Sequence, residues 1–359
     1  MRRSPISLTS IMLIVGAVIF VIYLYLADVT QIVATILSLD LRIALTAILI
    51  DLTCIGLFVL GWYLLLKNPG MSFKDCFEIV LVSIFGDLMI PTASISGEFF
   101  RVSLTVKRGR IQISEATASV LLHRILLALT FGVVLLASIF NLVGDQTAPV
   151  AEIYALGVLA IFDLAFGMAA MYMAMRADLF ERNVEKLAIK IGGFLRRFRP
   201  KYDPERLRES VLGGFRTFVQ AIKSVKPYTL VLSFLVLTAR WFLIAMIPYI
   251  MFISLGRPVS YWVVLGVTVF VSMVQMIPIG IPGMVGVMEV SMTAFFMGFG
   301  IPPALAASAT ILTRLVIFWF ELVISTFAAS LQGVRGLMMS YKMRNNSGHS
   351  VQGQNPEIV

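Results

Sequence analysis

Charged residues are scarce in this chain of 359 residues: Asp, Glu, Lys and Arg together make up 14% of it. Soluble domains carry about 25% of these residues. Hydrophobic residues instead reach 59%. Several apolar runs exceed the roughly 20 residues that a helix needs to cross a bilayer, and the alternation typical of outer-membrane barrel strands is missing. We therefore expect an all-α polytopic membrane protein.

Residues suited to redox, metal or covalent chemistry are also few. The chain has two Cys and two His, and their spacing builds neither a disulfide framework nor a metal site. Phosphate-binding loops, dinucleotide fingerprints and the common hydrolase and protease motifs are missing. A transport ATPase within this chain is thereby excluded. We predict no catalytic residue, no cofactor and no metal, so the protein is expected not to be an enzyme.

What the chain does contain is a repeated element, about 190 residues apart in its two copies. The first copy runs from Met89 to Ile125 and the second from Met276 to Leu315. Each begins with Met-Ile-Pro, continues with small residues interrupted by Gly, and then has a Glu and an Arg within apolar sequence. These pairs are Glu98 with Arg124, and Glu289 with Arg314. A doubled, charged element broken by Pro and Gly is typical of transporters built from internal repeats.

Two kinds of apolar segment can be distinguished. Six are long enough to be full spans: Leu8–Leu26, Leu41–Leu66, Ala116–Val143, Ala151–Met175, Thr229–Ile253 and Ala304–Leu331. Two others, Phe77–Phe100 and Tyr261–Phe299, are interrupted by Pro, Gly and polar residues. Because broken backbone at membrane depth must be buried in protein or line an aqueous cavity, we interpret these two as re-entrant helical hairpins.

The basic residues orient the chain, because loops rich in Lys and Arg stay in the cytoplasm. Arg2 and Arg3 place the N-terminus there, and the basic clusters on both sides of the first hairpin make it enter and leave from the cytoplasm. A cytoplasmic C-terminus then requires the second hairpin to enter from outside, although Arg257 lies in that outer loop. Hairpins inserted from opposite faces form an inverted repeat.

One transmembrane domain is expected over residues 1–340, with repeat halves at about 41–145 and 228–331. The halves are joined by the basic segment 176–227, whose helical periodicity suits a helix on the cytoplasmic membrane surface. A linker helix packed on the bundle explains the same pattern. Residues 341–359 are polar and are predicted to form a disordered cytoplasmic tail.

The ionisable residues inside the apolar segments are the candidates for function, because such groups are costly in a membrane. The predicted substrate-binding residues are Glu98, Arg101, Arg124, Glu289 and Arg314. Guanidinium groups clamp phosphate or carboxylate, and the N-terminus of a half-helix favours anions. We therefore predict a site for an anionic head group. In the alternative interpretation, the Glu and the Arg of each pair only neutralise each other inside the bundle and lock a hairpin to a span.

A second set of candidates is His123, Asp87, Asp163, Arg240 and Glu321, to which Asp51 is added as a further ionisable group in an apolar run. His123 suits either a proton relay or a packed neutral imidazole. Glu321 lies two helical turns after Arg314, so both are expected on one face. Asp163 and Arg240 are each mid-span and suit a pair between helices.

Both copies of the element carry a family resemblance. The first signature consists of Pro91, Ser96-Gly97-Glu98 and Arg101, followed by Glu115-Ala116 and His123-Arg124. The second signature consists of Pro282-Gly283, Gly286, Glu289, Pro302 and Arg314. Over nearly its whole length the chain resembles the lysylphosphatidylglycerol synthase transmembrane (flippase-like) family. It departs from the family pattern in two places. Pro-Gly is usual before the first Glu, where this chain has the run from Pro91 to Ser96, and Glu-Arg is usual where this chain has His123-Arg124. We expect the protein to lack the soluble aminoacyl-transfer domain of the bifunctional members.

The resemblance implies a lipid translocase in the cell membrane. Its substrate would be an anionic or phosphate-bearing lipid, either a modified phospholipid or a polyprenyl-phosphate-linked sugar. Membrane lipids are the expected partners, with lipid-glycan or lipid-modifying enzymes beside them and no nucleic acid. Two alternatives stay open at this point: a secondary transporter of a small soluble anion, and a membrane-embedded enzyme or non-catalytic partner in lipid-glycan synthesis.

Overall fold

The computed structural model describes residues 8–26, 29–66, 70–90, 95–144, 149–198, 203–277 and 279–333. Within these ranges the chain is helical and has no strand. Its helices are α1 (Leu8–Leu26), α2 (Val29–Ser38), α3 (Leu41–Leu65), α4 (Phe73–Met89), α5 (Ile95–Gly109), α6 (Ile113–Leu142), α7 (Val150–Met175), η1 (Ala177–Phe180), α8 (Glu181–Phe198), α9 (Pro204–Ser224), α10 (Pro227–Ser254), α11 (Tyr261–Val274), η2 (Pro282–Met284), α12 (Val287–Gly298), α13 (Pro303–Arg314) and the π-helix η3 (Leu315–Phe320). The predicted tail, Arg2, Arg3, Pro91 and Pro278 lie outside the described residues.

Five helices are long and apolar enough to cross a membrane. They are α3, α6, α7, α10 and the continuous helix from Pro303 through η3 to Gly333. Each corresponds to a predicted span within a few residues. In the first predicted span, α1, the stretch Ile14–Tyr25 is an apolar helix. The expected all-α polytopic membrane protein is therefore confirmed.

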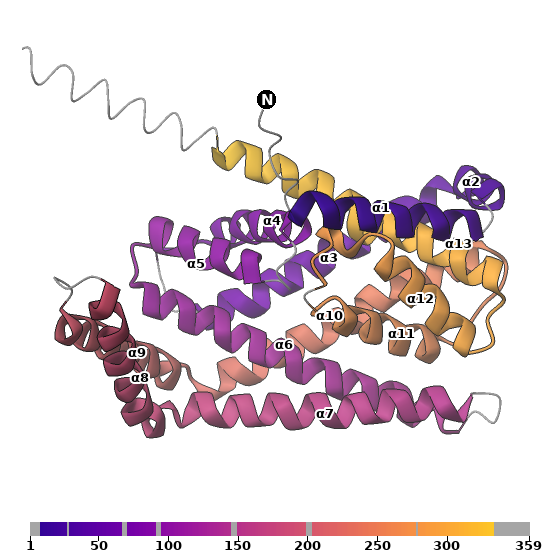
Figure 1. Cartoon of the computed structure of the whole chain (residues 1–359). Coiled ribbons are helices and arrows are strands. Elements are labelled where there is room, and N and C mark those ends of the chain that lie inside the picture. Colours follow the sequence, from indigo (N-terminus) through magenta and orange to yellow (C-terminus); the bar gives the residue numbers. More distant parts are fainter. Residues whose placement is uncertain are drawn as a thin grey trace, which may run out of the picture.

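The two interrupted segments are hairpins inserted from opposite ends of the bundle. Helices α4 and α5 lie in the half that is nearest α8 and α9, whereas α11 and α12 lie in the other half (Figure 1). Each repeat therefore has the order span, hairpin, span: α3, α4–α5 and α6, then α10, α11–α12 and α13. At the base of the first hairpin, Arg108 on α5 pairs with Glu78 on α4 at 3.0 Å. The predicted inverted arrangement is present in the fold.

The segment before α3, which the sequence suggests is only a connection, contains the helix α2. Its Ile36 packs against the main core and against the smaller cluster around Tyr23. Tertiary packing of one apolar face thus stabilises a ten-residue helix that is too short to be stable alone.

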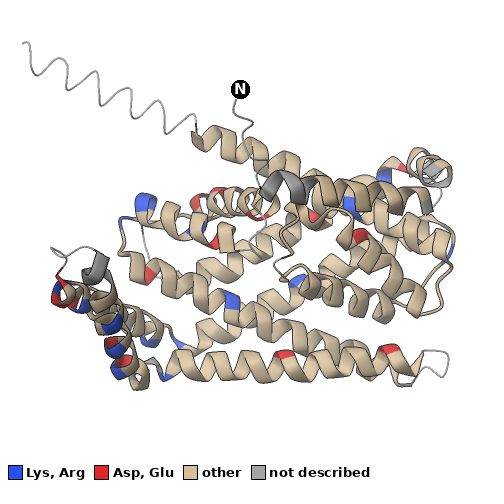
Figure 2. Cartoon of the chain, in the orientation of Figure 1, with Lys and Arg blue, Asp and Glu red and all other residues tan. Residues whose placement is uncertain are grey.

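Helices α8 and α9 form a charged pair at one end of the bundle, where coloured residues gather in Figure 2. Arg208 on α9 donates to Glu185 on α8 at 2.8 Å, and Arg216 donates to Glu181 at 2.6 Å. Helix α9 packs on α6 and α7, as a linker helix packed on the bundle would. The apolar side chains Leu187, Ile191 and Phe194 of α8 remain exposed.

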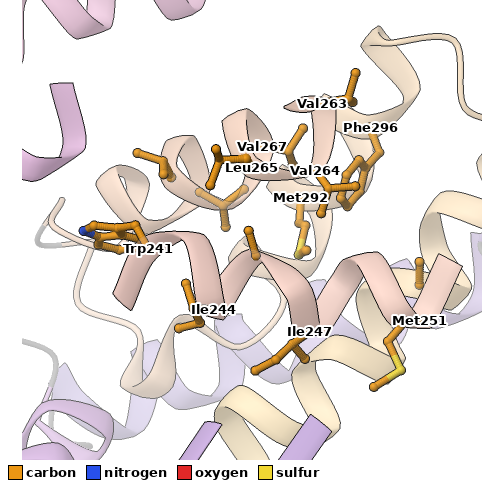
Figure 3. Packing of buried hydrophobic residues seen from close by; sticks show 14 of the residues in the cluster. Trp241, Ile244, Ile247, Met251, Val263, Val264, Leu265, Val267, Met292 and Phe296 are labelled. Atoms are coloured by element: carbon orange, nitrogen blue, oxygen red, sulfur yellow. The ribbon is translucent and has the colours of Figure 1, made fainter. Parts of the chain in front are cut away.

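The main apolar core lies between α10 and the second hairpin. Trp241, Ile244, Ile247 and Met251 of α10 belong to one cluster with side chains of α11 and α12 (Figure 3). The direct contact between the helices includes the rings of Phe252 and Phe296, whose centres are 4.9 Å apart. In a bilayer this contact contributes through close van der Waals packing, because lipid tails are as apolar as the side chains themselves. The core therefore holds the second hairpin firmly against the first span of its own repeat.

Helices α3 and α10, the first spans of the two repeats, pack closely along each other at Gly61. The Ser233 hydroxyl on α10 donates to the Gly61 carbonyl oxygen at 2.7 Å. A Cβ atom at Gly61 would lie 2.8 Å from the nearest Leu237 side-chain atom, which is too close. Gly56, one and a half turns earlier on α3, has nothing within 4 Å of a Cβ position.

We expect Gly61→Ala to destabilise the protein by about 1–3 kcal/mol, because the added methyl overpacks the α3–α10 contact. The matched variant Gly56→Ala should be neutral or slightly stabilising, because alanine has the higher helix propensity. Thermal unfolding of the purified protein in detergent measures both. Equal unfolding temperatures for the two variants would contradict the close contact at Gly61.

Candidate functional site

One cavity of about 230 Å³ lies between the two repeats and collects most of the predicted site residues. Of the predicted substrate-binding residues, Glu98, Arg101, Arg124 and Arg314 line it, and the ion pair to Arg314 brings Glu289 next to it. Of the second set, Asp87, His123, Arg240 and Glu321 line it. The sequence thus identified most of the ionisable lining of a cavity that only the fold assembles.

The pair from the second repeat is enclosed by protein. Arg314 Nε donates to Glu289 Oε1 at 2.7 Å, and an Arg314 terminal nitrogen donates to the Gly283 carbonyl oxygen at 3.0 Å. The second carboxylate oxygen of Glu289 accepts from the Gly286 N–H at 2.7 Å. Only 5% of the Arg314 side chain and 1% of the Glu289 side chain are exposed. Arg314 therefore ties the tip of the second hairpin to α13.

The local sequence shapes this enclosure. Gly283 and Gly286 have φ of +60° and +86°, in the left-handed region that glycine adopts without strain. A Cβ at Gly283 would lie 2.4 Å from the ring of Phe318, the same ring that lies under the Arg314 guanidinium at 4.2 Å. Phe318 belongs to the π-helix η3, which begins directly after Arg314. Such π-helical segments are rare and are frequent at functional sites.

The corresponding pair of the first repeat faces the cavity. Arg124 and Glu98 form an ion pair in which 30% and 28% of the side chains are exposed. The surrounding protein therefore leaves this pair accessible to a ligand, whereas it encloses Glu289 and Arg314. The two copies have the same residues and different environments.

The N-terminus of α5 points toward the middle of the bundle, as expected for an anion-binding half-helix, and a protein carboxylate occupies it. Asp87 on α4 accepts from the Gly97 N–H at 2.8 Å and from the Ser96 hydroxyl at 3.3 Å. A Cβ at Gly97 would lie 2.2 Å from the Asp87 carboxylate. Asp87 thus caps α5 and closes the hairpin, and Glu289 does the same at Gly286 for α12. The predicted free N–H groups are partly satisfied within the protein.

Arg101 is a buried cation that has no carboxylate partner among the described residues. Only 4% of the residue is exposed. Its terminal nitrogens lie 3.3 and 3.4 Å from His123 Nδ1, and its guanidinium lies 4.4 Å from the Trp62 ring centre. Because guanidinium only donates, Nδ1 must accept, so His123 is a neutral imidazole here. This geometry favours the packed imidazole over the proton relay.

A second set of charges gathers where α10 meets α3 and η3. Arg240 lies over the rings of Phe58 and Trp241, at 5.4 and 5.0 Å from their centres. Glu321 lines the cavity together with Arg314, as the two-turn spacing predicts. Asp51 lies behind them and is fully buried.

The pairing that the mid-span positions of Asp163 and Arg240 allowed is not the one that the fold makes. Asp163 on α7 instead accepts from the Gly132 N–H of α6 at 2.9 Å, so it joins two spans away from the cavity. Its short side chain reaches the backbone because Gly132 lets Leu164 approach closely. The sequence showed that both residues were mid-span and carried no information on which helices are neighbours.

The aromatic walls of the site were missed by sequence reasoning. Phe58 and Trp62 are one turn apart on α3 and both contact the Arg101 guanidinium. The one signal in the sequence is their spacing of four residues, which places them on one face of the helix. The same spacing is equally typical of an ordinary core-facing helix. Among the described residues, no group of three His, Cys, Asp or Glu side chains is placed to hold a metal ion.

Fold and cavity together define a multi-pass membrane protein in which two oppositely inserted hairpins bring paired charges to a central cavity. The chain belongs to the family described as the lysylphosphatidylglycerol synthase TM region, whose model matches residues 12–325. It is similar to a UPF0104 membrane protein of Pyrococcus horikoshii, with 27% identity over 86% of this chain and 92% of the relative. A UPF0104 membrane protein of Methanothermobacter thermautotrophicus is 24% identical over 86% of this chain and 91% of the relative. No solved structure matches the chain.

The two ion pairs should differ in their contribution to stability. We expect Arg314→Ala to destabilise the protein by about 3–5 kcal/mol, because it leaves the Glu289 carboxylate buried without its partner. Arg124→Ala should cost about 1 kcal/mol or less, because Glu98 is partly exposed to the cavity. Unfolding temperatures in one detergent compare the two. A larger loss for Arg124→Ala would mean that the enclosed pair is not the structural one.

Proposed function

We propose that the protein moves an anionic lipid between membrane leaflets and that the lipid head group enters the central cavity. The observation that carries this proposal is Arg101, a buried guanidinium that faces the cavity with no carboxylate ion pair among the described residues. An uncompensated ion costs several kcal/mol in a low-dielectric interior. A bound phosphate or carboxylate would offset that cost.

The pairing of the charged groups near Arg101 supports an anion rather than a cation. Glu98 is already paired with Arg124, and Glu289 with Arg314. Asp87 accepts hydrogen bonds at the α5 N-terminus. The group left to receive a ligand is a guanidinium, which binds phosphate and carboxylate through a planar set of donors.

The remainder of the lining supports a lipid over a small soluble anion. Apolar side chains such as Leu127, Ile244 and Ile317 line the same cavity as the arginines. A ligand with one charged end and one apolar end matches such a lining. The family's own description also refers to the synthase of a lipid, lysylphosphatidylglycerol.

In this proposal the site residues bind and position, and none performs covalent chemistry. Arg101 binds the anionic group, with Trp62 and Phe58 holding its guanidinium in place. Glu98 positions Arg124 at the cavity surface, and Arg314 holds the second hairpin. The end of the bundle that carries α8 and α9 faces the cytoplasm of a cell membrane, because its loops hold most of the Lys and Arg residues.

Binding is tested by native mass spectrometry of the protein with phosphatidylglycerol added at increasing concentration. Arg101→Gln should weaken retention of the lipid about 10- to 150-fold, because charge-assisted hydrogen bonds contribute about 1.5–3 kcal/mol. The matched control is Arg257→Gln, which removes one positive charge from an exposed loop residue and should leave retention unchanged.

Adding inorganic phosphate as a competitor of the bound lipid distinguishes a lipid head group from a small soluble anion as the ligand. Lipid retention that depends on Arg101 and is not displaced by phosphate supports the lipid assignment. Dependence on Arg101 with full displacement by phosphate would assign the site to a soluble anion. Equal retention in wild type and both variants would contradict the site itself.

A further inference from the structure

Two carboxyl groups meet beside the cavity and have no role in the proposed anion binding. Asp51 on α3 is fully buried, and neither of its carboxylate oxygens receives a hydrogen bond from an N–H or hydroxyl group. Its carboxyl group lies within hydrogen-bonding reach of the Glu321 carboxyl, at the end of the π-helix η3. A carboxylate only accepts, so a hydrogen bond between them requires one of the two to carry a proton.

The charged groups around Asp51 and Glu321 sum to zero when the two carboxyl groups carry one proton between them. Arg240 on α10 faces both carboxyl groups, and its Nε is buried without a hydrogen-bond partner. Arg314 on α13 also faces Glu321, but it is already paired with Glu289. Cys54 on α3 is the remaining ionisable neighbour, and its thiol donates to the Arg240 carbonyl oxygen at 3.8 Å. Two carboxyls with one shared proton and one guanidinium sum to zero charge, whereas loss of the proton leaves a net negative charge.

We propose that Asp51 and Glu321 form a proton-binding site that sets the charge of the central cavity. Glu321 and Arg240 line the cavity, so a proton on the pair removes one negative charge from the cavity wall and favours entry of an anion. When the proton leaves, the two carboxylates outweigh the positive charge of Arg240, and this part of the cavity wall becomes net negative. By thermodynamic linkage, a site that binds its anion better when protonated also takes up a proton when the anion binds. For the proposed lipid transport, on which this step rests, a proton would thus be the coupling ion.

The position of the pair suits such coupling. Asp51 belongs to the first repeat and Glu321 to the second, and α3 packs against η3. A movement of one repeat against the other, as alternating access requires, would change the distance between the two carboxyl groups. Separated carboxylates have no reason to share a proton, so the movement itself would release it.

Infrared spectroscopy of the purified full chain in lipid vesicles tests the site without a transport substrate. Wild type should retain a protonated-carboxyl absorption at about pH 7, where free carboxyls are ionised. Asp51→Asn and Glu321→Gln should each abolish this band. The matched control is Asp163→Asn, which changes a buried carboxyl that has a backbone N–H partner and, within the described part of the chain, no neighbouring carboxyl. It should leave the band in place.

The proposal is overturned if wild type shows no such band, if the band survives in both Asp51→Asn and Glu321→Gln, or if Asp163→Asn removes it. Unfolding temperatures recorded on the same samples show that each variant is folded, and the wild-type spectrum decides the question even if one variant is not. Because no lipid substrate enters this experiment, its outcome is separate from that of the lipid-binding experiment with Arg101→Gln.

Discussion

The cost of placing ions in a low-dielectric interior is the constraint on which the rest of this structure depends. Every ionised group at membrane depth needs a partner, a cavity or a proton. Arg314 and Glu289 meet the requirement by enclosing each other, and the enclosure binds the tip of the second hairpin to α13. Arg124 and Glu98 meet it at the cavity surface. Arg101 rests on aromatic rings and a neutral imidazole, which leaves its charge available.

The same constraint applies to the broken backbone of the hairpins. Helix ends leave N–H groups without partners, and in a bilayer no water is available to satisfy them. Asp87 takes this role for α5, and Glu289 takes it for α12. Each carboxylate therefore satisfies a helix end, and the same helix end stabilises the carboxylate. The hairpins can turn inside the bundle because these ends have partners there.

Although the repeats share residue types, they have diverged in role. The second repeat has a large aromatic and aliphatic core and an enclosed ion pair, so it resembles a fixed scaffold. The first has an accessible ion pair and, beside it, Arg101, which has no carboxylate partner within the described ranges. Asp51 and Glu321 connect the two repeats across the contact of α3 with η3. The accessible ion pair therefore lies in the first repeat and the enclosed one in the second.

The sequence by itself determined the membrane class, the spans and the inverted hairpins, because hydropathy, breaks by Pro and Gly, and the side preference of Lys and Arg are properties of local composition. It also identified both Glu–Arg pairs, because their spacing recurs in two copies. Only the tertiary structure decided that one pair is enclosed and the other accessible, that Asp163 binds the Gly132 N–H, and that Asp51 meets Glu321. Those outcomes depend on which helix faces are neighbours, and spacing along the chain does not specify contacts between different helices.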